Sequence, residues 1–228
     1  MKTALNMAKI GLKQTKISYY IVGVVLLLSI SGDIITTAIL GPGSDNTIAM
    51  GDYLYLLPLL MAILIPSQHF TKLMNLGGQR MDFFKSCIMA YLSVIAIVTL
   101  VSTVLYPTLY PLLLNSGMDI IILMDVFGFW AHGPVLAFIQ MFAFLTLSCC
   151  VLHTLTLIQG RWYGWVVDVL IIAIISIFTP FASLRVALIW FFNLIIFHND
   201  SIVQILLCLI LGAAVYSASL IPIKSKQI

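Results

Sequence analysis

The sequence lacks glutamate altogether, and its eight acidic residues are all aspartates. A metalloprotease of the His-Glu-x-x-His class needs a Glu general base beside its zinc-binding histidines, so this class is excluded. No two histidines have the spacing of metal ligands on one helix, and we expect them to be structural or interfacial. They are His69, His132, His153 and His198.

Other signatures of catalysis are also missing. The chain has no Gly-x-Ser-x-Gly sequence around a nucleophile and no Gly-x-x-x-x-Gly-Lys-[Ser/Thr] loop that would hold a nucleotide. The four cysteines lie in apolar runs without disulfide or metal-ligand spacing, which favours small buried hydrophobic side chains. We therefore expect no enzyme activity, metal or cofactor on this chain.

Charge is scarce. Only 8% of the residues are charged and 62% are hydrophobic, whereas soluble domains carry about 25% charged residues. Uncharged stretches enclosed by Lys85 and Asp119, and by Asp200 and Lys224, are long enough to cross a bilayer. The first apolar run is too long for a signal peptide and has no small-residue cleavage site before Asp33, which favours a retained span. The sequence predicts an all-α integral membrane protein.

The basic residues alternate with the apolar segments. Ten of the eleven lie where a topology of six spans needs its cytoplasmic ends, and only Arg185 falls outside this pattern. Five aspartates fall in the opposite loops. Because the cations are spread over membrane boundaries, they indicate contact with lipid headgroups rather than with nucleic acid. We expect both termini in the cytoplasm and a location in the cytoplasmic membrane of a bacterium.

Six apolar stretches account for the chain as one domain, 1–228, with a helix bundle over 17–223 and a cytoplasmic tail over 224–228. Pro58 and Pro66 predict that the second span is kinked or ends early. The segment Arg185–Asp200 is too short to cross and predicts a re-entrant or interfacial outer helix before the last span. The six expected spans are Ile17–Leu40, Tyr53–Gln68, Ser86–Tyr106, Val135–Ile158, Trp165–Leu184 and Ile202–Ile223.

The first sixteen residues predict a separate interfacial helix. Lys2, Lys9, Lys13 and Lys16 fall within a narrow arc of one helical face, with apolar residues over the rest. Such a helix lies among headgroups, with its apolar side toward acyl chains. The alternative is a disordered basic tail, which would not need its lysines in register.

Two aspartates lie inside expected spans, where an unpaired charge is costly and is a functional candidate. Asp33 has no obvious partner in the sequence. Asp168 lies near a helix start and close to Arg161, and this position favours a structural role.

The most informative segment is the inner loop 70–85. Its apolar residues Phe70, Leu73, Met74 and Leu76 have the spacing of a short amphipathic helix. Exposed apolar residues on such a loop indicate either a partner or the lipid surface.

The loop ends in Leu76-Gly77-Gly78-Gln79-Arg80-Met81-Asp82-Phe83-Phe84, which resembles the Leu-Gly-x-x-Arg-x-x-Phe-Phe pattern of ABC-2-type exporter permeases. The layout of the whole chain is similar to theirs. The resemblance implies a permease that pairs with an identical or related permease and with separate ATPase subunits, which bind the ATP and Mg. The loop would be the coupling helix seated on the ATPase, with Phe70, Leu73, Met74 and Leu76 docking and Gly78, Gln79 and Arg80 leading back into the membrane. Acidic residues are common here in the family, and this chain offers only Asp82.

The expected function is therefore ATP-driven export by alternating access. The polar side of the first span is the candidate lining of the substrate pathway. Its residues are Ser29, Gly32, Asp33 and Thr36. Methionine and aromatic side chains suit an amphiphilic, peptide or drug-like cargo. Two rivals are a stand-alone ion-coupled carrier or channel that uses Asp33 and Asp168, and a membrane scaffold or immunity protein that transports nothing.

Overall fold

The computed structural model describes residues 2–40, 47–75, 79–108, 110–111, 120–159 and 162–225. Over this part the chain is almost entirely helical, so the all-α prediction is confirmed. The only β structure in the described part is one pair of two-residue strands, in which Thr47 lies beside Ile120 in parallel register. The elements are α1 (Lys2–Gln14), α2 (Lys16–Leu40), β1 (Thr47–Ile48), α3 (Met50–Tyr53), α4 (Leu56–Leu64), η1 (Ile65–His69), α5 (Phe70–Asn75), α6 (Arg80–Thr108), β2 (Ile120–Ile121), α8 (Leu123–Val126), η2 (Phe129–His132), α9 (Pro134–Ile158), α10 (Trp162–Phe178), α11 (Ala182–Ile195), α12 (Ser201–Ala218) and α13 (Leu220–Ser225).

Several of these helices could cross a membrane. Among the described residues, three stretches are long and apolar enough: α6, α9 and the run Ser201–Ile223 through α12. The bent pair of α10 and α11 would make a fourth. An apolar side chain that faces lipid acyl chains is not exposed to water, so it does not destabilise the protein. The many exposed aliphatic residues on these helices suit that environment.

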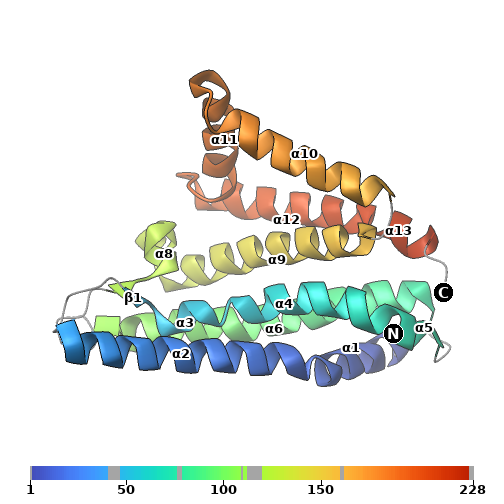
Figure 1. Ribbon diagram of the computed structural model, residues 1–228, viewed down its shortest axis with the longest axis horizontal. Coiled ribbons are helices and arrows are strands. Elements are labelled where there is room, and N and C mark those ends of the chain that lie inside the picture. The colour runs from blue at the N-terminus through green and yellow to red at the C-terminus, as the bar shows by residue number, and fades with distance from the viewer. Residues whose placement is uncertain are drawn as a thin grey trace.

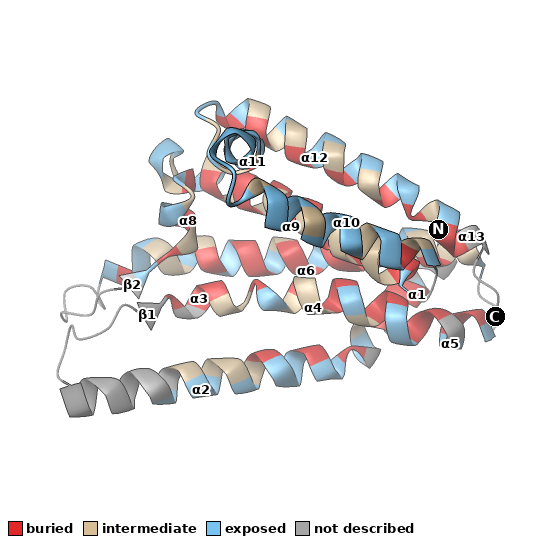
Figure 2. Ribbon diagram, turned by 45° about the horizontal axis from the view of Figure 1, so that its top comes forward, coloured by how far each residue is buried: buried red, intermediate tan, exposed pale blue. Residues whose placement is uncertain are grey.

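The long helices run roughly along one direction, and the two ends of the bundle differ (Figure 1). Both termini lie at the same end as α5 and α13, whereas α8 and β1 lie at the other end. Helix α9 is central, because it packs against α12, α4 and α6, and α1 packs against α6. Among the described elements, α6 and α9 accordingly contribute the most buried side chains (Figure 2).

The helix that contains Pro66 does not end there, so the predicted early end of the second span is wrong, and the predicted kink stays a prediction. Proline has no N–H to give to the helix and clashes with the preceding turn. The chain accommodates it by widening to the π-helix η1, so α4, η1 and α5 follow one another without a break from Leu56 to Asn75. The short helix that the sequence predicted as a separate element of the inner loop 70–85 is α5, which continues α4 through η1.

The α10–α11 pair stands apart from the bundle. Pro180 disfavours a helical conformation at Thr179, and α10 ends at Phe178 rather than at the expected Leu184. Helix α11 then runs at 118° to α10 and returns to the start of α12. Most residues of both helices are exposed (Figure 2).

A buried polar cluster joins three helices in the interior. The Tyr91 hydroxyl of α6 and Nδ1 of His153 in α9 are 2.9 Å apart, within hydrogen-bond distance. The Tyr216 ring of α12 lies against the imidazole with a centroid distance of 5.1 Å, and its hydroxyl donates to the Phe84 carbonyl of α6. His153 is 0% exposed. In a medium without water these groups depend on one another for hydrogen bonds.

This dependence predicts a coupled effect of two substitutions. His153→Leu removes the imidazole partner of the Tyr91 hydroxyl, which we expect to lower stability by about 1–3 kcal/mol. Adding Tyr91→Phe removes that hydroxyl and restores part of the loss. Thermal unfolding of the four proteins in detergent measures the coupling, and strictly additive losses would show that the pair contributes nothing together.

Candidate functional site

The apolar side chains expected to dock a partner are buried within the chain. Phe70 is 1% exposed, Leu73 3% and Met74 6%. The Phe70 ring meets the edge of Phe83 on α6 at a centroid distance of 5.1 Å. The expectation of an exposed apolar face on this segment is wrong, because α5 continues α4 and keeps that face toward the core. A role of the segment in docking stays a prediction.

Helix α1 covers part of this segment. Its residues Met7, Ala8 and Gly11 line a narrow internal gap together with Leu73 and Cys87. The sequence placed this apolar side against acyl chains, whereas the structure places it against protein. The reason is that α6 begins at Arg80, well before the expected Ser86, and its first turns offer α1 a packing surface.

The polar residues at this end of the molecule remain accessible. Lys72, Asn75 and Gln79 are exposed, and Arg80 is half-buried at the start of α6. The Gln79 carbonyl accepts the Phe83 N–H at 3.0 Å and so begins α6. Three lysines of α1 and α6 are exposed at the same end, namely Lys9, Lys13 and Lys85. The surface is thus polar and basic.

Two residues of the predicted docking segment, Leu76 and Gly78, lie outside the described residues. The predicted substrate pathway lies on α2. Ser29 is half-buried there, and Gly32, Asp33 and Thr36 belong to the helix, but their side chains are outside the description. The pathway therefore stays a prediction.

Asp168 joins the end of α9 to the first turns of α10. Its carboxylate accepts a hydrogen bond of 2.8 Å from Nε2 of Gln159. Gly164 permits the close approach of these helices, since a Cβ there would lie 2.4 Å from the Ile158 carbonyl oxygen. This environment favours a structural role for Asp168 at a tight turn.

The opposite end holds a junction that the sequence did not reveal. The backbone of Gly51 receives a hydrogen bond from Ser102 Oγ at 3.2 Å and donates one to the Tyr110 hydroxyl at 3.2 Å. A Cβ at Gly51 would lie 2.5 Å from that hydroxyl oxygen, so any larger residue there would displace the Tyr110 side chain. Next to it, the carboxylate of Asp52 accepts the Leu123 N–H at 2.7 Å. The junction thus fastens α3 to α6 and to the segment before α9.

Asp52 has an unusual protonation equilibrium. It is 5% exposed, and burial raises the pKa of its carboxyl to about 6. The Leu123 N–H opposes this shift in pKa and the nearby Asp125 carboxylate adds to it. Tyr110 in the same junction has its pKa raised to about 12, chiefly by burial and secondly by the charge of Asp52. Asp52 is therefore protonated below about pH 6. Above that pH it is ionised, and its buried charge destabilises the fold.

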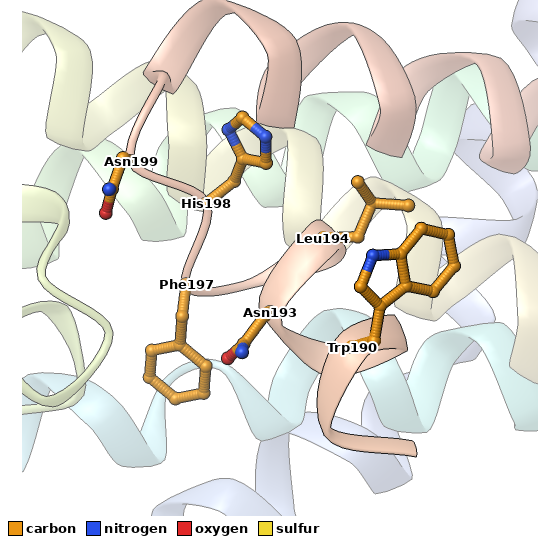
Figure 3. Close-up of a pocket in the computed structure, with 6 residues that line it drawn as sticks. All are labelled: Trp190, Asn193, Leu194, Phe197, His198 and Asn199. Carbon is orange, nitrogen blue, oxygen red and sulfur yellow. The ribbon is translucent and has the colours of Figure 1, made fainter. Parts of the chain in front are cut away.

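Two cavities flank the loop between α11 and α12. One has a volume of about 430 Å³ and contains Asn193, whose amide lies between Trp190 and Phe197 (Figure 3). The other, of about 470 Å³, lies toward α8 and is lined by Asp125, His132 and Gln140, among others. In the part of the chain that the structure describes, no group of three His, Cys or Asp side chains is placed to hold a metal ion. The cavities therefore offer hydrogen-bonding groups and aromatic rings.

The pKa of Asp52 predicts a pH-dependent stability. Its folded-state pKa exceeds the unfolded value, so the contribution of Asp52 to stability falls as pH rises from about 4 to about 6 and is then constant. We expect Asp52→Asn to be more stable than the wild type at pH 7, by on the order of 1–3 kcal/mol, with the gap closing near pH 4.5.

The measurement is thermal unfolding of both proteins between pH 4.5 and 7.5, and Asp200→Asn is the matched control. Asp200 is exposed and caps α12 through the Ile202 N–H at 3.0 Å. Its substitution tests for a general effect of removing an outer carboxylate. A constant difference between wild type and Asp52→Asn at all pH values would contradict the assignment.

Comparison of the chain with models of protein families, with curated protein sequences and with solved structures found no match.

Proposed function

We propose that the chain is the transmembrane permease subunit of an ATP-driven exporter of the ABC-2 type, in the cytoplasmic membrane of a bacterium. The observation that carries the proposal is the order of the helices. A short basic helix comes first, a helical segment at the same end as both termini joins the second and third apolar helices, and a sharply bent pair precedes the last.

Six spans fit this order. They would be α2, α4 with η1, α6, α9, α10 and α12, with α11 as an interfacial helix before the last span. Basic residues accumulate at the end that holds α5 and the termini, and the aspartates of α3, α8 and the α12 cap lie in elements of the other end. By the tendency of Lys and Arg to stay inside, the α5 end would be cytoplasmic.

The buried state of Phe70 changes how a partner would bind. The contact would be made by exposed polar residues, chiefly Lys72, Asn75 and Gln79, while Phe70, Leu73 and Met74 join α5 to α6 and α1. The exposed cations would pair with acidic residues on the ATPase. Substituting Leu73 or Met74 by Asp would test folding rather than docking, because both lie in the core.

Mechanistically, force applied to α5 would move several helices together. Helix α5 is continuous with α4, and its apolar side chains belong to the same core as those of α1 and α6. A tilt imposed by ATP-driven closure of the ATPases would pass through this core, whereas α10 and α11 pack more loosely and could shift separately. Two arrangements of the bundle, biased by nucleotide, would expose the pathway on α2 to each side in turn. Closure with a second permease, identical or related, would complete the pathway for an amphiphilic, peptide or drug-like cargo.

The ion-carrier alternative receives little support from Asp168. Its carboxylate is bonded to Gln159 at a helix junction near the α5 end, and within the described residues it belongs to no group of three His, Cys or Asp side chains placed to hold a metal ion. A carrier would then have to rely on Asp33.

The coupling surface predicts a charge-specific effect. We expect Lys72→Glu to reduce recovery of an ABC ATPase with the detergent-purified chain by about fivefold or more, because opposite charges at an interface favour association. Lys72→Arg is the matched control and should retain the partner. Recovery is measured by mass spectrometry of the purified complex and by its ATP hydrolysis.

Thermal stability should be the same in both variants, because Lys72 is exposed. Purification of the wild type without any ATPase would contradict the proposed function. Equal recovery of the ATPase with both variants would contradict only the assigned contact.

A further inference from the structure

A large apolar crevice lies between the α10–α11 pair and the rest of the bundle. Its volume is about 860 Å³, within the range of about 300–1,000 Å³ typical of ligand pockets. Of the sixteen side chains that line it, only Ser148 is polar, and its hydroxyl donates to the Phe144 carbonyl of the same helix at 3.0 Å. The crevice therefore offers no free polar group and suits a hydrocarbon occupant.

The walls come from helices that could lie within a bilayer. Ile171, Ile174 and Ile175 face the crevice from α10, and Leu147 and Val151 face it from α9. Inside a membrane such a space is not filled by water, because its walls offer no hydrogen bonds. An empty crevice would forfeit dispersion contacts along every wall. A flexible acyl chain from the surrounding lipid can supply these contacts.

Helix α11 presents two different faces to its surroundings. Leu188, Phe192 and Ile195 line the crevice, whereas Trp190 and Asn193 line the separate cavity shown in Figure 3. A helix with one apolar face and with Trp and amide groups on another is typical of the zone between acyl chains and headgroups. One wall of the crevice thus belongs to a helix of interfacial composition, which suits the depth at which the acyl chain of a lipid begins.

A positive charge lies on the same helix. Arg185 is exposed on α11 three residues before Leu188, which lines the crevice, so the two residues share a helical face. It is the only Lys or Arg between Arg161 and Lys224. A guanidinium group binds phosphate with two parallel hydrogen bonds. The charge on this face of α11 and the apolar crevice together match the two parts of a phospholipid.

We propose that the crevice holds an acyl chain of a phospholipid from the adjoining leaflet, and that Arg185 binds the phosphate of the same molecule. The bound lipid fills the space between α10, α11 and α12 and supports the bent pair, which otherwise has little packing of its own. This inference rests on the membrane location of the chain and on the proposed interfacial position of α11, and it does not depend on export.

The test uses phosphatidylglycerol that carries a photoreactive diazirine in its acyl chain, mixed into phosphatidylcholine vesicles that contain the full-length protein. After illumination, mass spectrometry of peptides locates the label. We expect labelling on Ile171–Ile175 and on Leu188–Ile195. Labelling confined to the outward surfaces of α2 and α12 would overturn the proposal, and this experiment on the wild type requires no substitution.

Matched substitutions separate the crevice from the general lipid surface. Ile174→Trp narrows the crevice, because Ile174 lines it. Ile172 does not line the crevice and its side chain is 62% exposed, so Ile172→Trp leaves the crevice open. We expect loss of labelling on α11 only for Ile174→Trp, with both proteins eluting as monodisperse species. Arg185→Gln should reduce labelling by phosphatidylglycerol about fivefold relative to labelled phosphatidylcholine.

Equal labelling of the two Trp variants would overturn the site. An unchanged preference for phosphatidylglycerol in Arg185→Gln would overturn the role of that residue. Efficient disulfide formation between two copies of Ile174→Cys, together with absent lipid labelling, would assign the crevice to a second chain and also overturn the proposal.

Discussion

The packing of α9 against its neighbours is the constraint on which the rest of the structure depends. The hydrocarbon core of a bilayer offers no water to polar groups, so hydrogen bonds between side chains of neighbouring helices favour their association there. Three hydrogen-bonded pairs join α9 to its neighbours. Gln140 donates to Gln204 of α12 at 2.8 Å, Tyr91 of α6 lies within hydrogen-bond distance of His153, and Thr154 donates to the Val215 carbonyl of α12 at 3.1 Å. Glycine contributes as well, because Gly212 lies close to the backbone of Leu147.

A firmly held α6–α9–α12 core gives the two ends of the molecule different properties. At one end, α1 and α5 rest on the first turns of α6 and present lysines and amides to the surroundings. At the other end, the Gly51–Asp52 junction ties short helices to α6, and α10 and α11 diverge from α9 and α12. The α6–α9–α12 core thus carries a basic surface at one end, and the loosely packed helices α10 and α11 diverge from it at the other. This arrangement suits a subunit driven from outside, since the surface that would receive force is continuous with that core.

The sequence was sufficient for the helical class and for the approximate position of most helices, because long apolar runs, charged boundaries and prolines act locally. The start of α9 follows from Gly133, which has φ +92°, and from Pro134 in the first turn. The burial of Phe70, Leu73 and Met74 could not be predicted in the same way. An amphipathic pattern shows that one face avoids water, but it does not show whether lipid, a partner or the same chain covers that face. That depends on α6 beginning at Arg80, and on the continuity of the helix through Pro66, which a π-turn permits.

The outer junction was missed for a related reason. Gly51, Ser102, Tyr110 and Leu123 are far apart in the sequence, and nothing in their local patterns indicates that they meet. Asp52 was identified only as one of several outer aspartates, although its burial sets it apart from Asp125 and Asp200. His153 was expected to be structural or interfacial, and its burial beside Tyr91 depends on the packing of α6, α9 and α12, which the sequence does not reveal.

The side of the membrane on which α5 lies tests the account most directly. The four native cysteines are all buried, so a single cysteine introduced at the exposed Asn75 or Asn199 can be followed with a membrane-impermeant thiol reagent. In sealed right-side-out vesicles the account predicts immediate labelling of Asn199→Cys, and labelling of Asn75→Cys only after the membrane is opened. Labelling of Asn75→Cys in sealed vesicles would place α5 outside the cell, where no ATPase could act on it, and would contradict the account.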